Sequence, residues 1–149
     1  MHHLETLNGL KLQGAWCTIG SFDGVHRGHQ AIISSLVRAA HAANAPAVVV
    51  TFHPHPAVLL RGITTPFYIT SPQERADLLA QLGVDYVITL PFDRAMAALG
   101  ADEFMHMLAD HLGLAWLWVG HDFALGRGRS GNISALQAIG QQLGYQLQV

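Results

Sequence analysis

The stretch AWCTIGSFDGVHRGHQAIISSLVRAA at residues 15–40 predicts a strand, a loop and a helix in direct succession. Segment 15–20 is uncharged and mostly apolar, which is typical of a strand buried on both faces. Segment 29–43 carries Ile, Leu, Val and Ala at helical spacing and is expected to form an amphipathic helix. The connecting loop, GSFDGVHRGH at 20–29, holds three glycines, two histidines and an aspartate. A strand that enters a helix through such a loop is the repeating unit of α/β folds.

The same alternation of apolar runs and amphipathic stretches continues to the end of the chain. Ser71, Pro72 and Glu74 form a capping-box pattern, which predicts that a helix begins there. Further strands are expected at 47–52, 84–90, 114–119 and from 145 onward, helices at 71–82, 101–112 and 133–143, and loops at 53–70 and 120–132. Because the strands are apolar on both faces, we expect an α/β fold. Its centre would be a Rossmann-like, doubly wound parallel sheet of about five strands with helices on both faces.

A doubly wound sheet binds its ligands at the carboxyl ends of its strands. The segments that follow the expected strands are 20–29, 53–56, 91–94 and 120–132. We therefore look for functional side chains in these four loops.

The composition argues against several classes of protein. The 149 residues suffice for one domain with its own core. The formal net charge is −2 and there is no run of basic residues, so nucleic-acid binding is not expected. No apolar stretch approaches the roughly 18 residues of a membrane span, and the N-terminus lacks a secretion-signal pattern. Cys17 is the single cysteine and cannot form an internal disulfide, which favours a cytoplasmic protein.

Two further features suggest that this domain belongs to a larger protein. Only 12% of the residues are charged, against roughly 25% in an average soluble domain, which suggests an apolar surface that meets another domain or subunit. The chain stops at Val149, inside the last expected strand. We therefore expect residues 1–149 to form one domain that is truncated at its C-terminal end.

The loop at 20–29 has the features of a phosphate-binding loop. The helix that follows begins near Arg27, and its free N–H groups and dipole favour an anion. His26 and His29 are three residues apart, which places both imidazoles on one side of the first turn, and Gly28 between them leaves room for a ligand. Imidazoles donate hydrogen bonds to phosphate and, when protonated, offset the charge that develops there.

Other interpretations of this region stay open. In one, His26 serves only to cap the helix while His29 packs against the sheet. Alternatively, both histidines bind a metal ion together with Asp23, His53 and His55, although the spacing is not that of a typical zinc site. Asp23 either orients the loop or lies near Mg²⁺.

The loops after the second and fourth strands add candidate residues. TFHPHP at 51–56 is stiffened by two prolines and offers a rigid apolar wall, or it is a plain turn. GHDFALGRGRSGN at 120–132 contains G-x-G-x-x-G, but a polar-aromatic segment separates it from the strand, so a dinucleotide fingerprint is not expected. We expect instead a mobile flap in which Arg127 and Arg129 bind phosphate. Asp122 either meets the ribose or base of a nucleotide or orders the loop.

Three motifs, in order, resemble those of a known family. The H-x-G-H at 26–29 is similar to the signature of the nucleotidyltransferase superfamily. IGSFDGVHRGHQ at 19–30, VVTFHPHP at 49–56 and VGHDFALGRGRSG at 119–131 resemble the adenylyltransferase module of prokaryotic-type FAD synthetase. The resemblance covers nearly the whole chain. It implies transfer of AMP from ATP to FMN with Mg²⁺, without a covalent intermediate, and a C-terminal riboflavin kinase domain that this chain lacks.

The resemblance also implies roles for individual residues. His26 and His29 would be catalytic, contacting the ATP phosphates and stabilising the transition state. The implied nucleotide-binding residues are Gly20, Phe22, Asp23, Gly24, Gly28, Asp122 and Arg127. The implied flavin-binding residues are Pro54, His55, Pro56, Phe123 and Leu125. No resident metal site is implied, because Mg²⁺ accompanies ATP.

The chain departs from the family pattern at three points. Leu125 stands where the family usually has an aromatic residue, and His53 occupies a position that is often acidic. The family's I-S-S-x-x-I-R segment would follow the last strand, beyond Val149. Two other functions stay open: transfer to another phosphorylated acceptor, such as phosphopantetheine or glycerol phosphate, and nucleotide or flavin binding by a fragment that is inactive alone.

Overall fold

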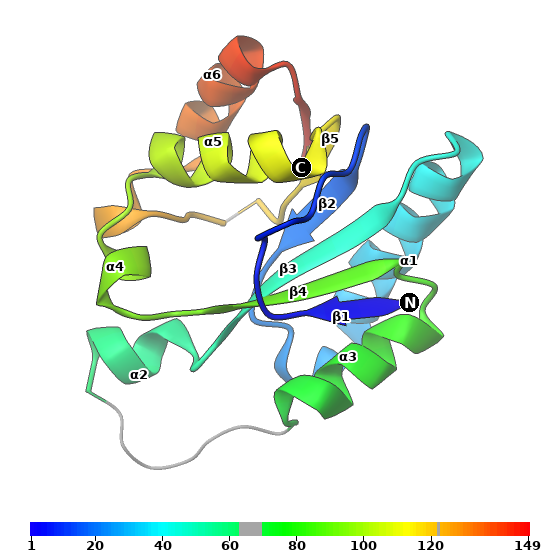
Figure 1. Ribbon diagram of the computed structural model, residues 1–149, viewed down its shortest axis with the longest axis horizontal. Helices are drawn as coiled ribbons and strands as arrows, with labels where there is room; N and C mark the ends of the chain where they lie inside the picture. The colour runs from blue at the N-terminus through cyan, green and yellow to red at the C-terminus, as the bar shows by residue number, and fades with distance from the viewer. Residues whose placement is uncertain (63–69, 122) are drawn as a thin grey trace.

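The computed structural model of the protein describes residues 1–62, 70–121 and 123–149. A six-stranded sheet in the order β1-β4-β3-β2-β5-β6 forms its centre, and all neighbouring strands in it are parallel (Figure 1). The strands are β1 (His2–Leu4), β2 (Trp16–Ile19), β3 (Ala47–His53), β4 (Tyr86–Pro91), β5 (Trp116–Trp118) and β6 (Gln146–Gln148). The predicted parallel α/β sheet is confirmed.

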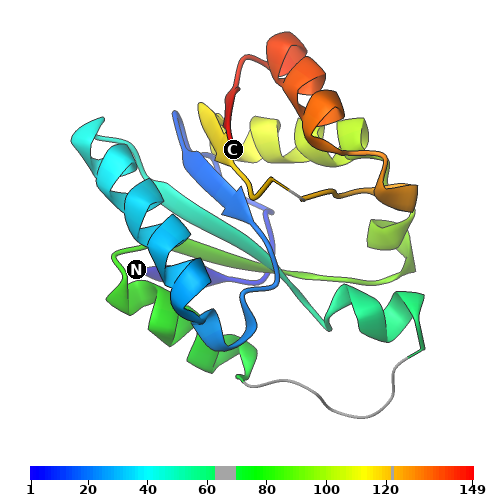
Figure 2. The ribbon, with the colours of Figure 1, turned by 180° about the vertical axis from the view of Figure 1, so that it is seen from behind.

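Helices cover both faces of this sheet, as the doubly wound prediction requires. The helices on one face are α1 (Arg27–Ala42) and α3 (Pro72–Gln81) (Figure 2), and those on the other are α5 (Ala101–Leu112) and α6 (Ile133–Leu143) (Figure 1). Side chains alternate along β3, so that Val48 and Val50 belong to the core on the α5 side and Val49 to the core on the α1 side. A strand buried on both faces therefore needs the unbroken apolar run that the sequence shows.

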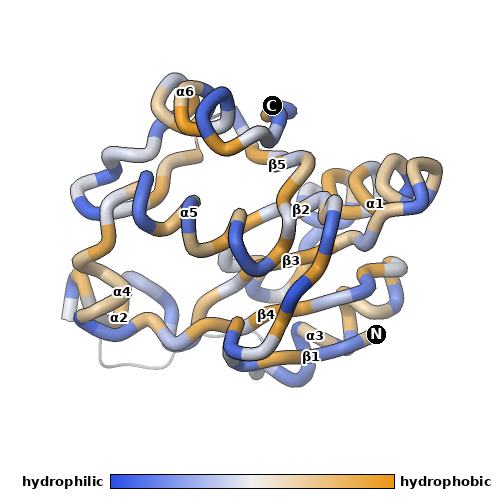
Figure 3. Tube along the Cα trace, turned by 45° about the horizontal axis from the view of Figure 1, so that its top comes forward, coloured by the Kyte–Doolittle hydropathy of each residue, from blue (hydrophilic) through white to orange (hydrophobic). Residues whose placement is uncertain are grey.

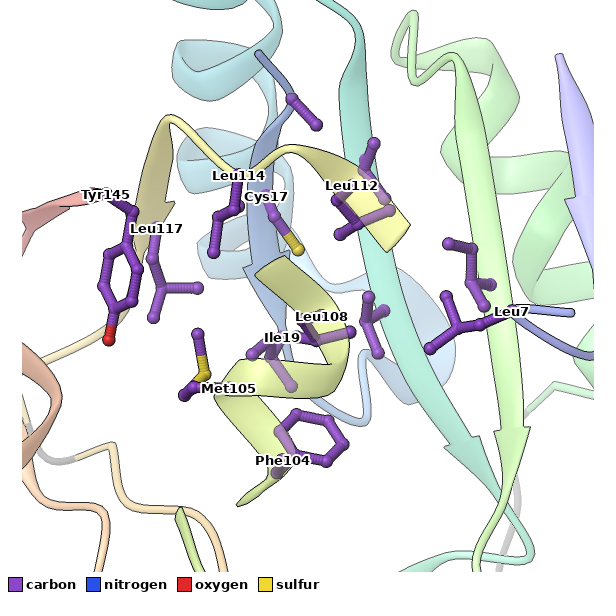
Figure 4. Packing of buried hydrophobic residues seen from close by; sticks show 14 of the residues in the cluster. Leu7, Cys17, Ile19, Phe104, Met105, Leu108, Leu112, Leu114, Leu117 and Tyr145 are labelled. Atoms are coloured by element: carbon purple, nitrogen blue, oxygen red, sulfur yellow. The ribbon is translucent and has the colours of Figure 1, made fainter. Parts of the chain in front are cut away.

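The core on the α5 side is the larger of the two. Figure 4 shows Met105 and Leu108 of α5 packed close to Ile19 of β2, and all three side chains are buried. Burying a side chain of this size contributes about 1.5–3 kcal/mol. In Figure 3 the central strands are largely orange, whereas the helices alternate between orange and blue along their length. None of the helices in the described part of the chain is long and apolar enough to cross a membrane.

Several elements differ from the sequence-based expectation. β1 was not predicted, because it is a three-residue edge strand that begins with two histidines and, among the described strands, pairs with β4 alone. The segment 53–70 is not all loop, since it contains the short helix α2 (Pro56–Leu60). A further short helix, α4 (Arg94–Ala97), follows β4. Helices of one turn are too short to show an amphipathic period, so their sequences resemble loops.

Candidate active site

The loops after β2, β3 and β5 lie at one edge of the sheet, because parallel strands end on the same side (Figure 1). After β2 the chain turns through η1 (Asp23–Val25), and Phe22, Gly24 and Val25 adopt positive φ angles of 51°, 74° and 44°. Phe22 is buried beside this turn, and a Cβ on Gly20 would lie 2.9 Å from its ring. Gly20 and Phe22, both candidates for nucleotide binding, therefore also shape the loop.

His26 and His29 are in direct contact. Their rings stack with centroids 3.5 Å apart, and the ring of Phe22 meets His29 edge-on at 5.1 Å. The predicted placement of both imidazoles on one side of the first turn is confirmed. Burial, and secondly the neighbouring His26, lower the pKa of His29, so its imidazole is neutral near pH 7. The Nδ1 atom of His29 is buried and has no hydrogen-bond partner among the described residues.

His26 is also the N-cap of α1. Its Nδ1 atom accepts hydrogen bonds from the backbone N–H groups of Gly28 (3.1 Å) and His29 (3.4 Å). A Cβ on Gly28 would lie 3.0 Å from the His26 ring, so the glycine makes room for that imidazole. That Gly28 also leaves room for a ligand stays a prediction. The capping interpretation of His26 is correct. Because Nδ1 accepts two hydrogen bonds, the neutral ring carries its proton on Nε2.

Asp23 orders the first loop. Its Oδ1 accepts hydrogen bonds from the backbone N–H of Thr70 (2.9 Å) and from the Thr70 hydroxyl (2.8 Å), and that hydroxyl in turn accepts from the N–H of Gly24 (3.2 Å). Of the two roles considered for Asp23, these contacts support orientation of the loop. Within residues 1–62, 70–121 and 123–149 no group of three or more His, Cys, Asp or Glu side chains is arranged to hold a metal ion.

The TFHPHP segment joins the end of β3 to α2. His53 is exposed and followed by a cis peptide bond to Pro54, whereas Pro56 is the first residue of α2. His55 is half-buried, and its carbonyl accepts a hydrogen bond from the N–H of Val58 (2.9 Å) in the first turn of that helix. Burial is the main cause of the lowered pKa of His55; Arg75 and Arg61 lower it further, and Asp23 opposes them. His55 and Asp23, from two different loops, are thus brought within electrostatic reach of each other.

The glycine-rich loop after β5 is anchored to the rest of the domain. Leu125 and Gly131 form an antiparallel bridge with N–H to O distances of 3.1 and 2.8 Å, and the N–H of Arg127 donates to the carbonyl of Leu99 (2.9 Å). A Cβ on Gly126 would lie 2.7 Å from the backbone nitrogen of Ala101, the first residue of α5. Gly126 and Gly131 of the apparent G-x-G-x-x-G therefore serve close packing within the domain, whereas no atom lies within 4 Å of a Cβ on Gly128. β5 ends at Trp118, so a segment separates it from the first of these glycines. The mobile flap stays a prediction that these contacts do not favour.

An open, largely apolar pocket with a cavity volume of about 160 Å³ lies at the same sheet edge on the α5 side. Its described lining comprises Phe52, Leu60, Phe92, Met96, Ala97, Leu99, Phe104, Leu125, Gly126, Arg127 and Gly128. Among the candidate residues, Leu125 and Arg127 contribute to this lining. Pro54, His55, Pro56 and Phe123 are not part of it; Phe123 packs against the core and its N–H donates to the carbonyl of Gly120 (3.1 Å). Asp122 lies outside the described residues.

The sequence interpretation missed Arg75 of α3, which lies behind the first two loops. Its side chain is only 2% exposed, and Nη1 donates to the Thr51 hydroxyl (2.8 Å) and to the carbonyl of Ser21 (3.0 Å). A charged residue in an amphipathic helix is normally assigned to the solvent face. The spacing to Leu79, four residues on and fully buried, is the signal that places Arg75 on the inner face.

The domain is thus a parallel α/β sheet with a loop of two stacked histidines at the carboxyl end of β2. The chain belongs to the FAD synthetase family, whose model matches residues 10–149. It is 39% identical over 145 residues to the bifunctional riboflavin kinase/FMN adenylyltransferase of Escherichia coli (strain K12), covering 97% of this chain and 46% of that protein. The protein of the same name from Haemophilus influenzae is 37% identical over 135 residues, covering 90% of this chain and 44% of that protein. The chain thus spans about half the length of these relatives.

Two solved structures share the fold. A structure titled macrolide-efflux protein from Streptococcus pneumoniae superposes with a TM-score of 0.79 at 24% identity, covering 98% of this chain and 48% of that one. Pantoate-beta-alanine ligase from Francisella tularensis superposes with a TM-score of 0.61 at 14% identity, covering 99% of this chain and 65% of that one. At such identities the similarity shows the architecture alone.

Proposed function

We propose that this chain transfers AMP from ATP to FMN, giving FAD and pyrophosphate. The observation that carries the proposal is the stacked pair of His26 and His29 at the start of α1, on the same sheet edge as the open apolar pocket. Relatives named riboflavin kinase/FMN adenylyltransferase support it.

In the proposed reaction a phosphate oxygen of FMN attacks the α-phosphorus of ATP. The new P–O bond completes the diphosphate of FAD while the bond from the α-phosphorus to the bridging oxygen breaks and pyrophosphate leaves. Such a transfer needs positioning and charge stabilisation, with no covalent step on the protein. Negative charge grows on the leaving pyrophosphate, and the Nε2–H of His26 is the donor suited to stabilise it. His29 would gain a proton as the triphosphate approaches, adding a second charge-assisted donor.

The pocket would take the flavin ring. Phe52 and Phe92 give it aromatic walls, with their rings 5.6 Å apart in an edge-on arrangement. A flat, largely apolar ring fits such a site, and the guanidinium of Arg127 at the lining suits the phosphate of FMN. Leu125 would supply an aliphatic wall in place of a stacking aromatic. Pro54 and Pro56 would act by fixing the start of α2, whose last residue Leu60 lines the pocket.

The remaining expectations concern cofactor and partners. Mg²⁺ would arrive with ATP, held mainly by its phosphates, as is usual for nucleotide substrates. Because the chain spans about half the length of bifunctional relatives, we propose that the complete protein carries a riboflavin kinase domain that supplies FMN. Because the proposed reactions use ATP, we propose a cytoplasmic location for the protein. Asp122 and Gly24 remain proposed nucleotide contacts.

A panel of acceptors tests the proposal. The complete protein is incubated with ATP and Mg²⁺ and with FMN, phosphopantetheine or glycerol phosphate, and products are separated by chromatography. We expect FAD from FMN and no adenylylated product from the other two acceptors. A product from either of those acceptors, with none from FMN, would assign the chain to a different transfer reaction.

A further inference from the structure

Arg75 places a positive charge inside the fold, directly behind the two loops of the proposed active site. It is 2% exposed and is the largest of the fully buried side chains among the described residues. A buried cation is costly unless hydrogen bonds satisfy it. An arginine retained at such a position therefore needs an explanation beyond packing.

The hydrogen bonds of Arg75 join the ends of two neighbouring strands. Nη1 donates to the Thr51 hydroxyl (2.8 Å), to the Ser21 carbonyl (3.0 Å) and, at 3.5 Å, to the Phe52 carbonyl. The Thr51 hydroxyl itself donates to the Ser21 carbonyl (3.0 Å). Ser21 lies in the loop that leads to His26, and Thr51 and Phe52 lie near the end of β3, just before the loop to α2. One guanidinium therefore holds the ends of β2 and β3 together.

The residue just before the N-cap of α3 also contacts the loop after β2. Thr70, which precedes the Ser71 N-cap, donates two hydrogen bonds to Asp23 and accepts one from Gly24. The charge of Arg75 also acts on the loop after β3. There burial is the main cause of the lowered pKa of His55, and Arg75 lowers it further. The first two turns of α3 thus contact both loops without containing a candidate substrate ligand.

We propose that Arg75 is a positioning residue for the adenylyl transfer. By fixing the Ser21 carbonyl and the end of β3, it sets the positions of His26 and His29 relative to the pocket proposed for the flavin ring. The inference rests on the proposed function. Arg75 acts through the backbone and does not touch substrate. Its rigid fork and permanent charge give stronger and better-directed bonds to carbonyl oxygens than a neutral donor would.

Three substitutions in the complete protein test the proposal. Arg75→Met removes the charge and the three hydrogen bonds described above. Arg75→Lys keeps the charge but has a single donor nitrogen, and Thr51→Val removes the bridging hydroxyl at nearly constant volume. Leu79→Ala is the matched control, because Leu79 lies one turn further along α3, is fully buried and belongs to the core between α3 and the sheet. That control should lower stability while leaving in place every hydrogen bond described between Arg75, Thr51 and the first loop.

Two measurements separate positioning from general destabilisation. In Arg75→Met we expect kcat for FAD formation to fall about 10- to 100-fold with a much smaller change in KM, because the geometry of the reacting groups is what is lost. Arg75→Lys should recover most of that loss, and Thr51→Val should show a smaller loss of the same kind. Leu79→Ala should keep kcat within about 2-fold of the parent value, since additive stability effects away from the site leave the loops in place.

Native-state hydrogen exchange gives a readout that does not depend on activity. In Arg75→Met and, to a lesser degree, in Thr51→Val, exchange of the amides at 21–24 and 51–53 should speed up more than exchange in the rest of the chain. Leu79→Ala should show no such local excess. Equal exchange at these amides in the Arg75 variants and the parent, or an equal fall of kcat in Leu79→Ala, would overturn the proposal. If the parent protein makes no FAD, the proposed function fails, and the exchange pattern alone then decides whether Arg75 holds the loops.

Discussion

His26 caps α1 and is also the proposed donor to the leaving pyrophosphate, and the first role restricts the second. As the N-cap of α1 it accepts two backbone hydrogen bonds on Nδ1, so a proton on that nitrogen would break the cap. A hydrogen bond that His26 donates to a substrate must therefore come from Nε2. His29 differs, because its Nδ1 is buried without a partner among the described residues and its pKa is lowered first by burial and then by His26. The sequence spacing predicts that these imidazoles meet, but not which nitrogen each has available.

ATP binding is predicted to raise the pKa of His29 and to take up protons. Burial and His26 hold this pKa below its ordinary value in the free protein, whereas a nearby triphosphate favours the charged form. The affinity for ATP should therefore increase as the pH falls from roughly 8 to roughly 6. Calorimetry in buffers of different ionisation enthalpy measures the proton uptake.

The matched control is a histidine far from the site. His29→Gln should abolish the proton uptake, whereas His41→Gln should retain it, because His41 lies at the other end of α1 beside Asp85. Equal uptake in the two variants would assign the proton to another group.

Gly131→Ala is predicted to lower the free energy of unfolding by about 1–3 kcal/mol. Its added methyl group would lie 2.6 Å from the Cβ of Ala101 and 2.8 Å from the carbonyl oxygen of Leu125, which leaves no space without a backbone shift. Urea denaturation measures the loss. Gly128→Ala is the control, since no atom lies within 4 Å of its Cβ position and only its positive φ is unfavourable. A larger loss in that control would show that close packing against α5 is not what the loop requires.

Helix α3 shows what local sequence can and cannot predict about an element. Its start follows from the S-P-Q-E pattern, and both hydrogen bonds of the capping box are present, from the N–H of Glu74 to Ser71 and from the N–H of Ser71 to Glu74, each at 3.1 Å. The inward turn of Arg75 depends on acceptors 24 and 54 residues away in the chain. Edge strand β1 likewise exists only because β4 is beside it. Local patterns carry no information about such distant partners.

Ser71→Ala is predicted to destabilise the protein by about 0.5–2 kcal/mol, because the N–H of Glu74 loses its acceptor. Thermal unfolding monitored by circular dichroism measures the change. Ser134→Ala is the control, because Ser134 is exposed inside the first turn of α6, where Asn132 is the cap. A loss as large in Ser134→Ala would mean that the hydroxyl at residue 71 acts through something other than capping.

In the whole molecule, the proposed site has two parts, one on each face of the sheet. The paired histidines stand at the start of α1, which covers one face, and the apolar pocket opens beside α5, which covers the other. The sequence predicts both loops at this edge, because parallel strands end together. The pocket lining could not be predicted, since it combines side chains from β3, α2, α4 and the loop after β5 that meet only in the fold.

Because ATP and FMN are proposed to bind at different parts of the site, different substitutions should weaken the binding of each substrate. Leu60→Glu should weaken FMN binding about 10-fold, because it places a charge at the apolar pocket, and should leave ATP binding unchanged. Leu60 is 67% exposed, so the fold should tolerate the change. Quenching of FMN fluorescence measures the flavin affinity. Ile32→Glu, on the exposed side of α1, is the control, and equal weakening of FMN binding in both variants would place the flavin elsewhere.

The central claim is tested most directly by the rate of FAD formation in the parent protein and in His29→Ala. With ATP, Mg²⁺ and FMN, the complete parent protein should form FAD and pyrophosphate in equal amounts. His29→Ala should unfold at nearly the parent temperature yet form FAD at least about 100-fold more slowly, as expected when a donor to the developing charge is removed. Absence of FAD in the parent protein, or FAD formation at the parent rate in His29→Ala, would contradict the account.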